Sequence, residues 1–354
     1  MPVTIHDVAK AAGLSIATVS RALNNTGHAV SDEKRQLIHE LAAEMGYQPN
    51  EAARSLRTDR SQIIGVIVDD ITTPFTPIII RGIQDTLKAA GYSCVILNTD
   101  WDPEVEKEAI RKLAQHSIKG IIFVETWHRQ ATSELGLNDK KVVFVHRLFS
   151  LPSLYSIVPD EIYGARLATQ HLVDLGHQRI AYINGPMNYY ASTDRLKGYQ
   201  SILHEAGIAF DESLIARGDW EVRSGFEAAL RLLDHPERPT ALFAANDKMA
   251  LGAIYAAQKL GLRIPYDLAV VGYDDTELAS LVQPMITTVT LPCYEMGEAA
   301  ARMLLELLAG SDDYKEEQRI RGELMIRESC GAIAPQSGRK LKPTAIQRRL
   351  TMMS

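Results

Sequence analysis

The chain has 354 residues, of which 46% are hydrophobic and 23% charged, and its formal net charge is −6. That length suits two or three domains, and no apolar run reaches the roughly 20 residues that a membrane span needs. The N-terminus has no basic segment followed by an apolar one, so we expect no secretory signal and a cytoplasmic protein. Cys94, Cys293 and Cys330 form no C-x-x-C pair, which argues against disulfides, a zinc site and a redox motif.

The first residues predict a short helix, a turn and a second helix. Thr4 and Asp7 have the spacing of a capping box. An apolar stripe follows at helical spacing: Ile5, Val8, Ala9 and Ala12. Gly13 can supply the positive φ of a tight turn, and Ser15 is placed to cap a second helix that runs through Leu23.

This second helix is expected to have two different faces. Val19, Ala22 and Leu23 form an apolar face. The remaining side chains are small or hydrogen-bonding and fit a major groove: Ile16, Ala17, Ser20 and Arg21. A third helix is expected after Ser31 as its cap and before Gly46, with one apolar stripe: Leu37, Ile38, Leu41 and Met45. Three short helices predict a compact head.

Acids and bases roughly cancel within this head, so the net charge does not predict a nucleic-acid partner. The placement of arginines is more informative, because Arg54, Arg57 and Arg60 recur every three residues. Taken alone, such a run is more often a solvated face than a DNA contact. The prediction of DNA binding therefore depends on the helices.

The residues from Thr4 to Asn24, TIHDVAKAAGLSIATVSRALN, closely resemble the helix-turn-helix signature of the LacI/GalR family of repressors. The resemblance implies that Ile16, Ala17 and Arg21 read base edges. It also implies that several neighbours hold phosphates or support docking: Ser15, Thr18, Ser20, Asn24 and His28. Arg21 can form two hydrogen bonds with guanine, worth about 1–3 kcal/mol of discrimination, whereas Ile16 and Ala17 offer only apolar contacts.

The segment at about 50–58 resembles the hinge helix of the same family. Asn50 is its expected cap, and Leu56 is the residue that wedges into the minor groove, with a buried hinge leucine as the alternative. Three further hinge residues are expected at the DNA: Ala53, Arg54 and Arg57. Because so short a helix is marginal in water, we expect order only on DNA. A wedge is best tolerated at a pyrimidine–purine step, so we expect a homodimer on double-stranded DNA, at a pseudo-palindromic operator with a central CG.

From Ile63 the pattern changes to alternating strands and helices. The continuous apolar run Ile63–Val68 predicts a strand buried on both faces, and a helix is expected at about Ile78–Ala90. Strands are also predicted at 94–97, 120–124 and 142–145, and a helix–glycine–strand unit recurs at 176–183, 207–214 and 261–271. This predicts a doubly wound α/β fold behind the all-α head. The resemblance implies two periplasmic-binding-protein-like lobes with a ligand cleft between them.

No motif of enzymatic chemistry accompanies this fold. The sequence has no G-x-G-x-x-G after the first strand, no P-loop, no H-E-x-x-H and no G-x-S-x-G. We therefore expect no cofactor, no metal and no enzymatic activity. The alternatives are an enzyme on the same fold and a solute-binding protein, the latter disfavoured by the missing signal and by the head.

Open α/β sheets bind ligands at the carboxyl ends of their strands, where several strings match the family. By this resemblance Arg195 holds the effector, together with Asn246 and Asp274, and Trp220 supplies a flat apolar wall. The alternatives are a surface arginine, a helix cap and a turn residue, respectively, and the last two are compatible with binding. An arginine, an amide and a carboxylate suit the hydroxyl groups of a sugar.

The resemblance assigns four more residues, in the first lobe, to the effector: Pro74, Phe75, His146 and Arg147. Phe75 is equally a core candidate. His146 stands where the family commonly has an acidic residue before the arginine, and Leu291 and Cys293 stand where some sugar-sensing members are polar or aromatic. These departures leave the ligand open, with a sugar or sugar derivative expected and a nucleoside or purine as the alternative.

Three parts are therefore expected. Residues 1–60 form the DNA-binding head with its hinge, and residues 61–331 form the effector-binding and dimerisation body. Residues 332–354 form a basic tail without a leucine heptad, which we expect to be disordered, with nonspecific DNA contact as the alternative. The predicted function is a transcriptional regulator, expected to be a repressor, whose operator affinity a small molecule controls.

Overall fold

The computed structural model describes residues 3–23, 30–47, 62–115, 118, 120–125, 141–147, 155–311 and 316–331. The chain divides into two compact units, Met1–Ile63 with Leu113–Ile118, and Ile64–Lys112 with Lys119–Ser354. The predicted hinge helix and the basic tail lie outside the described residues. Among the residues that are described, no helix is both long and apolar enough to cross a membrane.

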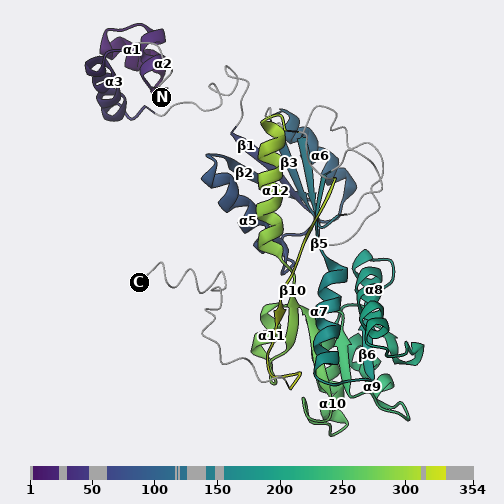
Figure 1. Ribbon diagram of the computed structural model, residues 1–354. Coiled ribbons are helices and arrows are strands. Elements are labelled where there is room, and N and C mark those ends of the chain that lie inside the picture. The colour runs from purple at the N-terminus through teal and green to yellow at the C-terminus, as the bar shows by residue number, and fades with distance from the viewer. Residues whose placement is uncertain are drawn as a thin grey trace. The chain divides into compact units, whose positions relative to one another are not determined.

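The head contains three helices: α1 Ile5–Ala12, α2 Ile16–Leu23 and α3 Asp32–Glu44 (Figure 1). The capping box is confirmed, because the Asp7 carboxylate accepts hydrogen bonds from the Thr4 backbone N–H (2.9 Å) and from the Thr4 hydroxyl (2.7 Å). Gly13 ends α1 with a φ of 65°, a left-handed conformation that favours glycine. The helix–turn–helix arrangement predicted from the sequence is therefore present.

The apolar stripes of the three helices meet in one small core. Its buried members are Val8, Ala9, Val19, Ala22, Val30, Ile38 and Ala42. The predicted stripe of α3 was wrong at Leu37, which is 45% exposed, because the buried face runs through Ile38 and Ala42. Ser31 occupies the N-cap position of α3 as predicted, but its side chain makes no capping hydrogen bond.

The body contains two six-stranded sheets, and the first has the strand order β11-β5-β4-β3-β1-β2. Its strands are β1 Ile63–Val68, β2 Ser93–Asn98, β3 Gly120–Val124, β4 Lys141–Val145, β5 Tyr155–Pro159 and β11 Glu317–Ile320. Its helices are α5 Thr76–Ala89, α6 Pro103–Gln115 and α12 Cys293–Leu308. The described pairings in this sheet, from β1–β3 through β5–β11, are parallel.

The second sheet has the order β12-β10-β9-β8-β6-β7. Its strands are β6 Ile180–Asn184, β7 Ile215–Arg217, β8 Ala241–Ala244, β9 Ala269–Asp274, β10 Thr287–Thr290 and β12 Leu324–Met325. Its helices are α7 Glu161–Asp174, α8 Tyr190–Glu205, α9 Val222–Leu233, α10 Asp247–Lys259 and α11 Glu277–Leu281, with a 3-10 turn at Glu212–Leu214. All described pairings are parallel except β10 with β12.

The chain passes between the two sheets three times, after β5, after β10 and after β11. Late segments therefore complete the first lobe: α12 lies against α5, and β11 pairs with β5 (Figure 1). Each lobe has its own apolar core, as the near-continuous hydrophobic runs of parallel strands require. The predicted α/β architecture with two lobes and crossing connections is confirmed.

Candidate functional site

In the head, α2 exposes the side chains that the sequence assigned to base recognition. Ile16 is 38% exposed, and Ala17 and Arg21 are also exposed. The Ser15 hydroxyl accepts a hydrogen bond from the Thr18 backbone N–H (3.2 Å) and lies 2.9 Å from the Thr18 hydroxyl. Ser15 therefore caps α2 as predicted and fixes its start.

Arg21 and Ser20 differ in how they are placed. The Arg21 Nε donates to the backbone oxygen of Ala17 (3.0 Å), so its two Nη atoms are the ones suited to guanine O6 and N7. Ser20 is only 8% exposed, so a supporting role fits it better than a phosphate contact. Seven predicted DNA-binding residues lie outside the described part of the chain: Asn24, His28, Asn50, Ala53, Arg54, Leu56 and Arg57.

In the second lobe, a network centred on Arg195 lies at the carboxyl ends of the strands. Arg195, from α8, is 4% exposed, so the surface-arginine interpretation is wrong. Its Nε and Nη2 donate to the two carboxylate oxygens of Glu161, the first residue of α7, at 2.8 and 2.9 Å. Its Nη1 donates to the backbone oxygen of Ala245, directly after β8, and lies 3.5 Å from Asp274 Oδ1.

Electrostatics and packing hold this network in place. The guanidinium lies 3.6 Å from the ring centroid of Tyr273, a stacking arrangement that favours a cation. Burial opposes the charge of Arg195, but the attraction of Glu161 and Asp274 prevails and keeps its pKa well above the usual range. Burial raises the pKa of Asp274 well above its ordinary value, although Arg195 works against that rise. Asp274 ends β9 with a φ of 101°, as expected of a turn residue.

Asn246 and Trp220 are linked to each other. Asn246 caps α10, because its Oδ1 accepts a hydrogen bond from the Met249 N–H (2.8 Å), as the cap interpretation predicted. Its Nδ2 donates to the backbone oxygen of Trp220 (2.9 Å). The Trp220 indole lies beside Tyr189 and Arg195, and its Nε1 is buried without a hydrogen-bond partner among the described residues. An indole N–H of this kind can donate to a ligand oxygen.

The first lobe contributes a second buried ion pair. Arg147 donates to the carboxylate of Glu125, which directly follows β3. Burial raises the pKa of Glu125 to about 7, although Arg147 works against that rise. His146 Nδ1 lies 3.2 Å from the Glu125 backbone oxygen, and burial lowers the His146 pKa. The His146 ring also meets Tyr190 of the second lobe edge-on, at 6.1 Å between centroids.

Of the other first-lobe candidates, Pro74 is exposed and Phe75 packs against the core. The Phe75 side chain therefore fits the core interpretation that the sequence left open. Leu291 and Cys293 are buried in the same core, and burial raises the pKa of the Cys293 thiol well above its usual range. The two positions at which this sequence departs from the family are therefore positions in the core of the first lobe.

Sequence reasoning missed the two carboxylates that pair with the arginines. Glu161 and Glu125 are both buried. Glu125 directly follows β3, and Glu161 comes two residues after the end of β5. A charged residue directly after an apolar strand was the available signal, because ligands bind at that edge of an open sheet. The pairing itself could not be read, since 34 residues separate Glu161 from Arg195.

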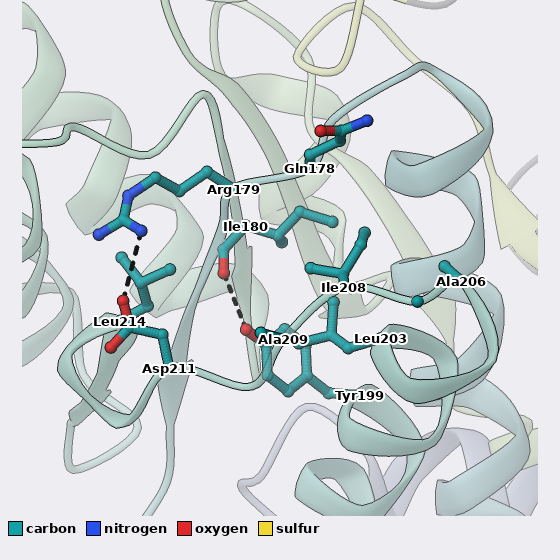
Figure 2. Close-up of a pocket in the computed structure, with 11 residues that line it drawn as sticks. Gln178, Arg179, Ile180, Tyr199, Leu203, Ala206, Ile208, Ala209, Asp211 and Leu214 are labelled. Atoms are coloured by element: carbon teal, nitrogen blue, oxygen red, sulfur yellow. Dashed lines mark hydrogen bonds and ion pairs between the residues drawn. The ribbon is translucent and has the colours of Figure 1, made fainter.

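A cavity of about 350 Å³ lies at the amino end of β6, away from the Arg195 network (Figure 2). Figure 2 shows Tyr199 donating to the Ile180 backbone oxygen (2.8 Å) and Arg179 paired with Asp211 (3.3 Å). None of the predicted effector residues lines this cavity. In the described residues, no group of three or more His, Cys, Asp or Glu side chains is arranged to hold a metal ion.

The head is a helix-turn-helix, and each of the two lobes has a mainly parallel sheet with polar side chains at its strand ends. These features define a ligand-responsive DNA-binding regulator. Comparison of the chain with known protein families, proteins and structures gives the same class. Residues 4–50 match the model of bacterial regulatory proteins of the lacI family, and residues 169–330 match the periplasmic binding protein-like domain. The transcriptional regulator DegA of Bacillus subtilis is 37% identical over 337 residues, which are 94% of this chain and 99% of DegA.

Two solved structures extend the likeness to the whole fold. The Lac repressor dimer bound to operator and the anti-inducer ONPF has a TM-score of 0.79 and 32% identity, over 93% of this chain and 99% of the other. The CelR–cellobiose complex has a TM-score of 0.65 and 30% identity, over 92% and 99%. The chain belongs to the LacI family of bacterial transcriptional regulators. It is a DNA-binding regulator whose operator affinity a small-molecule effector controls.

Proposed function

We propose that α2 reads the operator through Arg21, with Ile16 and Ala17 making apolar contacts and Ser15 and Thr18 fixing the helix on the DNA backbone. The observation that carries this proposal is the exposure of Ile16, Ala17 and Arg21 on a helix whose other face is core. Exposed side chains on a short second helix suit entry into a major groove. For Ser20 we propose a supporting role.

Two further proposals concern assembly and the boundaries of the parts. The chain acts as a homodimer, which calls for a two-fold symmetric operator, and the Lac repressor neighbour is a dimer on its operator. The operator is contacted at a central CG step, which is kinked by the hinge residues Asn50, Ala53, Arg54, Leu56 and Arg57. Asn24 and His28 contact the DNA backbone.

The head extends to about residue 60, the body to about residue 331, and the remainder is a basic tail. The protein acts in the cytoplasm and has no enzymatic activity.

The effector that we propose is a polyhydroxylated compound, a sugar or sugar derivative, held at the Arg195 network. Asp274 supplies a carboxylate acceptor, Trp220 an indole donor and an aromatic edge, and Asn246 fixes the Trp220 backbone. His146, Arg147, Pro74 and Phe75 form the first-lobe side of the site. The solved structure of CelR with cellobiose, which is similar to this chain, supports a sugar as the effector.

The experiment is operator release. The full chain is bound to its selected operator, and a panel of sugars is titrated while fluorescence anisotropy reports the complex. Wild type should respond to at least one sugar, and Asp274→Asn should lose that response while its operator affinity without sugar stays unchanged. The exposed Asp234→Asn is the matched control. A response that Asp274→Asn retains in full would remove the carboxylate from the site.

A further inference from the structure

An arginine in a ligand site suggests a surplus of positive charge that could bind an anion. The charged groups around Arg195 leave no such surplus. Arg195 faces two carboxylates, Glu161 and Asp274, and Arg147 faces Glu125. The nearby cations that the structure describes are matched too: Arg319 and Lys197 with Asp194, and Arg327 with Asp275. Among these groups, five carboxyl groups face five cations, so none of the five cations is left without a carboxyl partner.

Glu161 occupies one of the two edges through which Arg195 could bind an anionic ligand with two hydrogen bonds. Carboxylates and phosphates bind arginine through two parallel N–H···O bonds, and the Nε–Nη2 edge makes that pair with Glu161 at 2.8 and 2.9 Å. Glu161 is fully buried, at 0% exposure, so water does not screen it. The remaining nitrogen, Nη1, already donates to the Ala245 backbone oxygen. A ligand carboxylate at the Nε–Nη2 edge would displace Glu161 and leave its charge buried and unpaired, and one at the Nη1 end would lie close to the Asp274 carboxyl group, 3.5 Å from Nη1.

We propose that Glu161 makes this regulator select an uncharged effector and reject its anionic counterparts, such as sugar acids and sugar phosphates. This inference rests on the proposed sugar site and narrows its ligand class. The hydroxyl groups of a neutral ligand can donate to Asp274 or accept from the Trp220 indole, and neither contact uses the Glu161–Arg195 pair. Glu161 is thus a specificity-determining residue that selects through charge.

The test uses matched neutral and anionic forms of the same carbon skeletons. The full chain is titrated by calorimetry with D-glucose, D-gluconate and D-glucose 6-phosphate, with D-ribose and D-ribose 5-phosphate, and with inorganic phosphate alone. The variants are Glu161→Gln and Glu161→Ala, both of which remove the charge beside Arg195, and either one suffices if circular dichroism shows it folded. Glu212→Gln, an exposed glutamate of the second lobe, is the matched control.

Wild type and the control should prefer the neutral member by at least about tenfold and should not bind phosphate. The folded Glu161 variant should lower that preference by about tenfold and gain phosphate binding that Arg195→Lys removes. Arg195-dependent binding of an anionic member by wild type would overturn the inference, as would a Glu161 variant that gains no phosphate binding. Failure of wild type to bind any sugar would count against the sugar proposal alone, because the phosphate titration still decides the role of Glu161.

Discussion

Removal of the two partners of the Glu161–Arg195 pair should be strongly non-additive: the double variant should lose less stability than the two single variants lose together. The substitutions are Glu161→Leu, Arg195→Met and the double variant. Removal of one member of a buried ion pair costs about 3–5 kcal/mol, because the other charge stays buried without compensation. Both side chains are at least 95% buried and share two well-formed hydrogen bonds, so Glu161→Leu should cost about 4 kcal/mol.

Arg195→Met should cost somewhat more, about 5 kcal/mol, because it also removes the contact with Ala245 and the stacking on Tyr273. The double variant leaves no unpaired charge in this pair. Its loss of unfolding free energy should therefore be about 3 kcal/mol smaller than the sum of the losses in the two single variants. Urea unfolding followed by circular dichroism and tryptophan fluorescence measures all four proteins. Additivity within about 0.5 kcal/mol would refute the reasoning, since it would mean that the two charges do not depend on each other.

Three further predictions concern other parts of the molecule. Arg21→Ala should lower selectivity at one guanine of each half-site by about 1–3 kcal/mol in anisotropy titrations, with nonspecific binding nearly unchanged; a uniform loss across sequences would assign Arg21 to a phosphate instead. Burial raises the pKa of Asp247 to about 7, and a carboxyl whose pKa is raised by folding contributes stability below its unfolded value that is lost as the pH rises through the folded one. The unfolding free energy of wild type relative to Asp247→Asn should therefore fall from about pH 4 to about pH 7, and a rise over that interval would show the opposite shift. A Cβ at Gly164 would overlap the Tyr273 hydroxyl, so Gly164→Ala should cost about 1–3 kcal/mol in urea unfolding and weaken the effector response; Gly176→Ala, where a Cβ meets no atom but φ is 90°, separates overlap from backbone strain.

The sequence predicted the regular elements closely wherever a single local rule governed them. Strands β1 and β3 have the predicted bounds, Ile63–Val68 and Gly120–Val124, because continuous apolar runs between turn residues have few other solutions in an α/β fold. α1 also begins and ends as predicted, between its capping box and Gly13. The periodicity of α3 was less decisive, because Leu37 and Ile38 are adjacent and only the packing of three helices decides which is buried.

The candidate site was predicted only in part, because its energetics depend on pairs distant in sequence. Arg195 and Asp274 were identified by their family strings, but nothing local indicates that a carboxylate at the start of α7 meets a guanidinium from α8. The same holds for Glu125 and Arg147, which come from neighbouring strands. Whether an arginine is available to a ligand depends on such partners, so the charge of the effector could not be predicted from the sequence.

The central claim is that the head reads a specific operator through α2, and in-vitro selection from a random duplex pool tests it most directly. Wild type and Arg21→Ala are selected side by side at one stated salt concentration, because the phosphate contribution to affinity depends on salt. We predict that wild type enriches a two-fold symmetric site with a central CG, and that the variant loses preference at one guanine in each half. Failure of wild type to enrich any sequence, with or without metabolite extract, or an identical site for the variant, would contradict this account.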